Sequence, residues 1–164
     1  MNFSELDKMI NSDAVNEELQ KQTEYETVPD GEYIVRFNDL VIGGTKEDNR
    51  PILKICVDVV DVLKDEECYD FTNNTDAQTF FSKYSKGKLF MNRVLFGTKS
   101  DARVIASAVA WLSKLDGDIE FSTYTKLSED VAELFNKIKD KYEYHIVYEK
   151  SKFNSISIKQ RYDI

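Results

Sequence analysis

Aromatic and basic residues interleave along one segment of the chain, between residues 80 and 96. The aromatic members are Phe80, Phe81, Tyr84, Phe90 and Phe96, and the basic members are Lys83, Lys86, Lys88 and Arg93. Aromatic rings stack on bases while lysine and arginine neutralise phosphates, so this pattern is typical of a surface that binds single-stranded nucleic acid, with about 1–3 kcal/mol per stacked base. Because only one face of a strand can be exposed, roughly half of these aromatic side chains are expected in the core.

A second, smaller cluster lies near the C-terminus and contains Tyr148, Lys150, Lys152 and Phe153. A phenylalanine at the tip of a hairpin does not supply turn chemistry, and its own strands cannot bury it. Phe153 is therefore expected to contact a ligand, a partner or another part of the protein surface. The residues predicted to contact nucleic acid are Phe80, Phe81, Lys83, Tyr84, Lys86, Lys88, Phe90, Arg93, Lys150, Lys152 and Phe153.

Catalytic and metal-binding patterns are weak by comparison. The chain has no GxxxxGK[ST] and no GxGxxG motif, so it offers no phosphate cradle for ATP or a dinucleotide. Cys68 and His145 are the only formal candidates for a thiol nucleophile and its base, and we predict that His145 instead pairs across a sheet. The acidic run 65–67 with Asp70 lacks the spacing and glycine of a calcium loop and is interpreted as a solvated loop. We expect no catalysis, no cofactor and no metal.

Composition narrows the class of protein further. A chain of 164 residues with 41% hydrophobic residues is long enough for one domain with its own core. Two cysteines without a CxxC motif exclude a disulfide scaffold. The N-terminus is acidic, unlike a signal peptide, and no apolar run approaches the roughly 18 residues of a membrane helix, so we expect a cytoplasmic protein.

The charge is unevenly distributed. The net charge is −8, but residues 1–30 hold eight acidic and two basic residues, whereas residues 83–103 hold six basic residues and one acidic residue. Local positive charge is enough for a nucleic-acid groove, although solvated faces of strands and helices explain the same charges. We therefore divide the chain into an acidic helical head, residues 1–27, broken near residues 11–13, and one domain, residues 28–164.

Period-2 patterns predict most of the strands. In the first, residues 32–42, Tyr33, Val35 and Phe37 alternate, but the next apolar position is Leu40, and this slip of one residue indicates a β-bulge. Further strands are expected at 52–63, 88–96 and 118–125, and a terminal hairpin at 143–150 and 155–162. Helices are expected at 76–84, 100–115 and 128–142, with Ser128 as the N-cap of the last.

This order of elements predicts an α+β, mainly β fold. We expect an OB-like antiparallel barrel with an N-terminal helical head and two inserted helices, because a long bulged first strand suits a small curved barrel. The alternative is an open antiparallel α+β sheet.

Several of these segments resemble a bacteriophage family catalogued as domain of unknown function 669. The resemblance rests on residues 29–35 (PDGEYIV), 53–55 (LKI), 87–92 (GKLFMN) and 152–162 (KFNSISIKQRY) and spans residues 28–164. It implies similarity to OB-fold single-stranded-DNA-binding proteins of phage replication and recombination, and hence the cytoplasm of a host cell. The chain departs from the pattern at residues 64–86, which look like an insertion, and in a tail without the acidic run that recruits partners.

Two functions from different classes follow. The first is a non-catalytic single-stranded-DNA-binding protein that works with phage recombination or replication proteins and associates, if at all, into a homodimer through exposed strand edges. The second is an acidic protein–protein adaptor or inhibitor of a host nucleic-acid-binding factor.

Overall fold

The computed structural model describes residues 2–16 and 27–164 and shows an α+β fold built on one antiparallel sheet. Five strands pair in the order β3-β2-β1-β4-β5. Their bounds are β1 Gly31–Gly44, β2 Pro51–Val62, β3 Lys88–Val94, β4 Tyr142–Glu149 and β5 Ser155–Asp163. The central strand β1 pairs with β2 through residues 33–44 and with β4 through residues 31–35. The predicted α+β class and the terminal hairpin are confirmed.

The bulge predicted in the first strand is present. In the ladder with β2, Phe37 pairs with Val57 and Asp39 pairs with Cys56, so Asn38 is the extra residue. Phe37 and Leu40 are both buried because the bulge restores the inward phase after the slip. The bulge therefore lets one long strand keep its apolar side chains on a curved inner face.

The sheet is open between its edge strands β3 and β5, so the closed barrel is not confirmed. Within the described residues, the ladder ends at these two strands. A side chain bridges the two edges: Met91 Sδ on β3 accepts the backbone N–H of Ile156 on β5 (3.3 Å). The indole N–H of Trp111, on the helix that follows β3, donates to the Ile156 carbonyl (2.6 Å).

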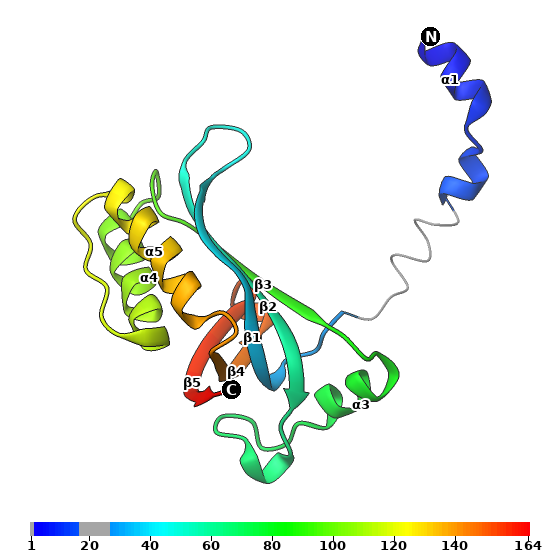
Figure 1. The fold of residues 1–164 in the computed structure, drawn as a ribbon. Coiled ribbons are helices and arrows are strands. Elements are labelled where there is room, and N and C mark those ends of the chain that lie inside the picture. The colour runs from blue at the N-terminus through cyan, green and yellow to red at the C-terminus, as the bar shows by residue number, and fades with distance from the viewer. Residues whose placement is uncertain (1, 17–26) are drawn as a thin grey trace.

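Two helices between β3 and β4 cover the inner face of the sheet. They are α4 Asp101–Asp116 and α5 Tyr124–Ile138, and they lie side by side, with α5 against β1 (Figure 1). The largest fully buried side chains come from the sheet, from these helices and from the turn after β3: Tyr33, Tyr144, Leu40, Leu53, Ile55, Leu89, Leu95, Leu112, Leu115, Leu127, Ile138 and Ile146. A third helix, α3 Thr75–Lys83, lies between β2 and β3 in the chain and follows the short 3₁₀ turn η1 Asp65–Glu67.

The predicted strand at residues 118–125 is wrong. The segment after α4, which ends at Gly117 with a positive φ of 87°, is irregular, and Thr123 caps α5 by accepting a hydrogen bond from the Lys126 N–H (3.0 Å). The Ile119 N–H donates to the Ser113 hydroxyl of α4 at 3.0 Å and not to a neighbouring strand. α5 therefore begins and ends four residues earlier than the predicted helix 128–142. The cap at Thr123 and the buried side chains of the first turns outweigh the short apolar alternation that predicted a strand.

The described part of the N-terminal head is helical and exposed. It contains α1 Phe3–Met9, with no buried residue, and a second helical stretch at residues 12–16 (Figure 1). The predicted break lies between the two, and Asn11 rather than Ser12 or Asp13 accepts the first backbone hydrogen bonds of the second stretch. Residues 1 and 17–26 of the predicted head lie outside the described residues. Among the helices described, none is long and apolar enough to cross a membrane.

Candidate nucleic-acid interface

The outer face of β1, β2 and β3 presents one exposed aromatic ring among polar side chains. On β3, Leu89 and Met91 point into the core, while Lys88, Phe90 and Asn92 are exposed by the alternation of the strand. The ring of Phe90 is 55% exposed. In the ladder Phe90 lies opposite Cys56, and Asn92 lies opposite Lys54.

A hollow of about 440 Å³ lies beside Phe90 on this face. It runs between β3 and the loop that joins β1 to β2, and its lining includes Lys46, Lys54, Cys56, Phe90 and Asn92. Lys46 and Lys54 have no carboxylate within ion-pair distance among the residues that the structure describes. These two lysines and Asn92 are not among the residues predicted from the sequence, although Lys54 alternates with the buried Leu53 and Ile55 and therefore faces outward.

The turn between β4 and β5 holds Phe153 away from the protein. The turn consists of the short 3₁₀ helix η2 Lys150–Lys152 followed by Phe153 and Asn154, both with positive φ (57° and 54°). A left-handed backbone is strained for a bulky residue, and such strain often marks functional positions. The ring is 85% exposed. Phe153 is thus kept at the tip at some cost in stability.

Arg93 connects the two clusters that the sequence analysis selected. Its Nη1 donates to the Phe153 carbonyl at 3.0 Å and to the Asn92 carbonyl at 2.8 Å, so the turn is fastened to the edge of β3. Burial lowers the pKa of the Arg93 guanidinium from its ordinary value. The structure therefore places Phe153 next to the edge strand that carries Phe90 and Arg93.

Several of the lysines predicted to contact phosphate are bonded to other side chains of the protein. Lys88 Nζ lies 2.7 Å from Asp58, and this ion pair raises the pKa of Lys88. Partial burial raises the pKa of Asp58, but the hydrogen bonds from Lys88 and Asn38 outweigh it and leave that pKa below its ordinary value. Lys152 pairs with Glu149 at 3.1 Å, and Lys150 donates to Thr27. Lys83, the last residue of α3, and Lys86, in the segment before β3, are exposed.

The predicted aromatic residues of α3 do not join this face. Phe80 is only 7% exposed, and its ring packs on those of Phe81 (4.9 Å) and Tyr84 (4.7 Å). Phe81 also contacts the ring of Tyr33 edge-on at 5.6 Å. Phe80 is removed from the set because its ring is in the core, and Phe81 and Tyr84 are half-buried packing residues.

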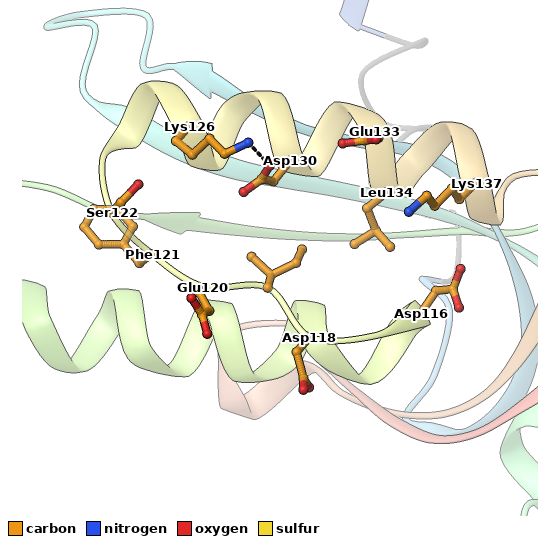
Figure 2. Close-up of a pocket in the computed structure, with 11 residues that line it drawn as sticks. Asp116, Asp118, Glu120, Phe121, Ser122, Lys126, Asp130, Glu133, Leu134 and Lys137 are labelled. Atoms are coloured by element: carbon orange, nitrogen blue, oxygen red, sulfur yellow. Dashed lines mark ion pairs between the residues drawn. The ribbon is translucent and has the colours of Figure 1, made fainter.

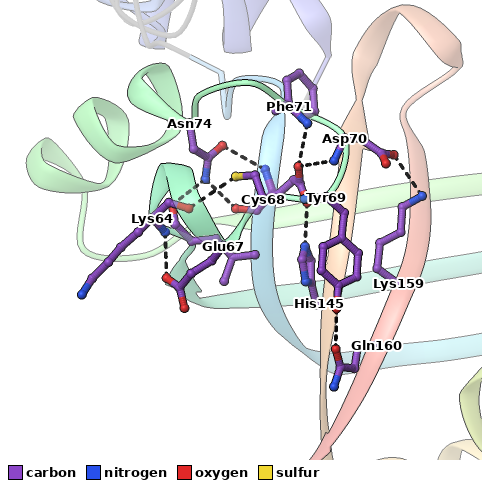
Figure 3. Close-up of polar contacts among 12 residues, drawn as sticks. Lys64, Glu67, Cys68, Tyr69, Asp70, Phe71, Asn74, His145, Lys159 and Gln160 are labelled. Atoms are coloured by element: carbon purple, nitrogen blue, oxygen red, sulfur yellow. Dashed lines mark hydrogen bonds and ion pairs between the residues drawn. The ribbon is translucent and has the colours of Figure 1, made fainter.

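A buried polar network lies where β1 pairs with β4, around Glu32 and His145 (Figure 3). Both side chains are buried, and His145 Nε2 lies 2.7 Å from Glu32 Oε1. The carboxylate also accepts the backbone N–H groups of residues 69, 70 and 71 at 2.8–2.9 Å. Burial raises the pKa of Glu32, yet these hydrogen bonds lower it more, so that the carboxylate stays charged. His145 thus pairs with a neighbouring strand, as predicted, through a partner that the sequence analysis missed.

Cys68 is close to this network but is not an activated nucleophile. Burial, followed by the charge and hydrogen bond of Glu32, raises the pKa of the Cys68 thiol to about 11. The thiol donates to the Lys64 carbonyl (3.5 Å), and His145 is committed to Glu32. The arrangement favours a neutral thiol and does not supply thiolate chemistry.

The acidic loop after β2 makes structural contacts. Asp65 accepts the Asn74 N–H at 2.8 Å. Asp70 pairs with Lys159 at 2.9 Å, as Figure 3 shows. No group of three or more potential metal ligands occurs among residues 2–16 and 27–164.

A separate groove of about 460 Å³ lies between α4 and α5 and is acidic (Figure 2). Its carboxylates are those of Asp116, Asp118, Glu120, Asp130 and Glu133, against Lys126 and Lys137. Lys126 is paired with Asp130 at 3.0 Å. A groove of this charge repels phosphates, so the nucleic-acid candidate is restricted to the β1–β3 face and the β4–β5 turn.

No protein-family model matches the chain, and neither a curated protein nor a solved structure matches it.

Proposed function

We propose that this chain is a non-catalytic single-stranded-DNA-binding protein of phage replication or recombination. The observation that carries the proposal is a pair of exposed rings at the edge strand β3. Phe90 lies on its outer face beside a hollow lined by Lys46 and Lys54, and Phe153 lies in the turn that Arg93 fastens to the same strand. Rings supply stacking for any base, and the lysines supply a backbone contact that does not depend on sequence. The proposed binding is therefore weakly sequence-selective.

The topology supports an OB-like interpretation of the sheet. OB-folds are partly open five-stranded barrels that bind oligonucleotides on the face of strands 2 and 3 and with the loops between strands 1 and 2 and strands 4 and 5. In this chain Phe90 and Lys54 belong to β3 and β2, Lys46 belongs to the β1–β2 loop, and Phe153 belongs to the β4–β5 turn. The resemblance to phage proteins described above agrees with this assignment.

Retardation of oligo-dT in a gel at about 50 mM salt and again at about 200 mM salt tests the proposal. We expect binding to single strands in preference to duplex, and marked weakening at the higher salt. Absence of retardation at micromolar protein and low salt contradicts the proposal and favours the second candidate, an acidic adaptor or inhibitor of a host nucleic-acid-binding factor. The acidic groove of Figure 2 supports that second candidate, because its charge suits a basic protein partner.

Asp58 places a negative charge next to the proposed path of the strand. Asp58→Asn keeps the shape of the side chain and frees Lys88 from its ion pair. We expect oligo-dT affinity to rise roughly two- to fivefold at low salt, by the loss of one screened repulsion, with a salt slope steeper by about 0.7. Asp118→Asn makes the same change of charge in the remote acidic groove and serves as the control. Equal effects of the two substitutions would mean that net charge alone, and not the position of Asp58, sets the affinity for oligo-dT.

The acidic head is expected to weaken DNA binding in cis. Residues 1–30 carry eight acidic residues against two basic ones, and α1 contributes nothing to the core. A chain that begins at residue 28 should unfold cooperatively and bind oligo-dT more tightly at low salt, with the difference screened at high salt. Thermal melts and binding isotherms on both chains make the comparison. Loss of cooperative unfolding in the shorter chain would mean that the head is part of the fold.

A further inference from the structure

A third hollow lies where the sheet fails to close, and it differs in charge from the other two. Its volume is about 340 Å³, and it is bounded by β3, the first residues of β5 and the first turns of α4. Its floor is apolar and includes Met91 and Ile156, and its walls include Arg93, Arg103 and Ser107. No acidic residue lines it, although the whole chain carries a net charge of −8.

The two arginines of this groove are available to an anion. Neither has a carboxylate within ion-pair distance among the residues that the structure describes. Arg93 uses only Nη1 for its two bonds to backbone carbonyls, which leaves Nε and Nη2 to donate elsewhere. Guanidinium groups bind phosphate oxygens through paired N–H donors, and the hydroxyls of Ser107, Ser155 and Ser157 add further donors to the lining.

One face of α4 forms a side of the groove. Arg103, Ser107 and Trp111 follow one another at intervals of four residues and so share one face of the helix. The Trp111 indole N–H is bonded to the Ile156 carbonyl at 2.6 Å, which fixes the ring across the opening between α4 and β5. The groove thus combines a preformed apolar floor with unpaired positive charge at its walls, and this suits a planar apolar group that carries a phosphate.

The groove is next to the proposed DNA face. Phe90 and Asn92 are on the outer face of the edge strand β3, and Met91 and Arg93 are on its other face and line the groove. A DNA strand that extends from Phe90 to the groove therefore has to cross only the edge of β3, where Arg93 is bonded to Phe153.

We infer that the groove between β3, β5 and α4 binds a further nucleotide of the same single strand, with its phosphate on Arg93 and Arg103 and its base on the floor formed by Met91 and Ile156. This inference rests on the proposed function. It predicts two parts of the binding site: short strands occupy the Phe90 face alone, and longer strands also enter the groove.

Arg103→Gln tests the inference, with Lys137→Gln, in the acidic groove of Figure 2, as a control of equal charge change. Binding is measured with oligo-dT of roughly 4 and roughly 16 nucleotides, which span the range of OB-fold site sizes. We expect Arg103→Gln to weaken binding of the longer strand roughly three- to tenfold and to lower its salt slope by about 0.7. Binding of the shorter strand should be unchanged, and Lys137→Gln should leave both strands unaffected.

Trp111 provides an independent readout, because it is the only tryptophan of the chain. The longer strand should quench its fluorescence, the shorter strand should not, and Arg103→Gln should shift the quenching curve to higher DNA concentration. Equal quenching by both strands, or equal effects of Arg103→Gln and Lys137→Gln, would overturn the groove inference while wild-type binding leaves the proposed function in place. Failure of the wild-type protein to bind either strand would overturn both.

Discussion

Replacement of Glu32 by alanine should destabilise the fold by about 3–5 kcal/mol, because each buried donor left without an acceptor costs about 1–3 kcal/mol. The substitution leaves four groups without their acceptor: the His145 ring nitrogen and the backbone N–H groups of residues 69, 70 and 71. Because a domain of this size has a total stability of about 5–15 kcal/mol, the loss is a large fraction of it. Urea unfolding of the variant and of the wild type measures the difference.

Glu66→Ala is the matched control, because Glu66 is an exposed carboxylate in the β2–α3 segment that Glu32 contacts. Its effect should be within about 0.5 kcal/mol. A similarly small effect of Glu32→Ala would show that the network of Figure 3 contributes little to stability.

Glu32 also predicts a dependence of stability on pH. Its pKa in the folded protein is below its ordinary value of 4.5, so its contribution is complete above that value and is lost as pH falls through the folded pKa. Glu32→Gln should therefore flatten the fall in stability at acid pH. If stability falls at acid pH as steeply in the variant as in the wild type, other carboxylates cause that fall.

The second large effect concerns the two exposed rings. The double variant Phe90→Ala with Phe153→Ala should weaken oligo-dT binding by about 2–6 kcal/mol, since each stacked base contributes about 1–3 kcal/mol. Stability should change little for Phe153, whose ring is 85% exposed, because surface substitutions usually fall within about 0.5 kcal/mol. Alanine is as unsuited as phenylalanine to the positive φ at this position, so the backbone strain stays comparable.

Phe121→Ala is the control for this pair, because Phe121 is a partly exposed ring in the acidic groove. It should bind oligo-dT like the wild type. The opposite pattern for Phe153→Ala would be a loss of about 3–5 kcal/mol of stability, the cost of removing a buried phenylalanine, with binding lost only through unfolding. That result would make Phe153 a packing anchor.

Features encoded locally in the sequence could be predicted. The slip between Phe37 and Leu40 located the bulge of β1, and the alternation of residues 53–59 separated the buried from the exposed face of β2. The terminal hairpin was also predicted, within one residue at each end. In each case the hydrophobic period of a single strand carries the information.

Features that depend on distant residues could not be predicted. Ile119, Phe121 and Thr123 alternate like a strand, but no edge of the sheet is paired with them, and the cap at Thr123 turns the chain into α5. Glu32 and His145 are 113 residues apart, and only the β1–β4 ladder brings them together. The same applies to the candidate site: the register of β2 against β3 sets Lys54 beside Asn92, and the tertiary fold joins Arg93 to Phe153.

The most direct test of the central claim is to map the amide chemical shifts of the protein while oligo-dT is added. The account predicts that the largest changes fall on the outer face of β2 and β3 and on the β4–β5 turn, including Lys54, Phe90, Asn92 and Phe153. It also predicts that residues of the acidic groove, such as Asp118 and Glu133, stay unchanged. Changes confined to the α4–α5 groove, or no change at saturating oligo-dT, would contradict the claim that this face binds single-stranded DNA.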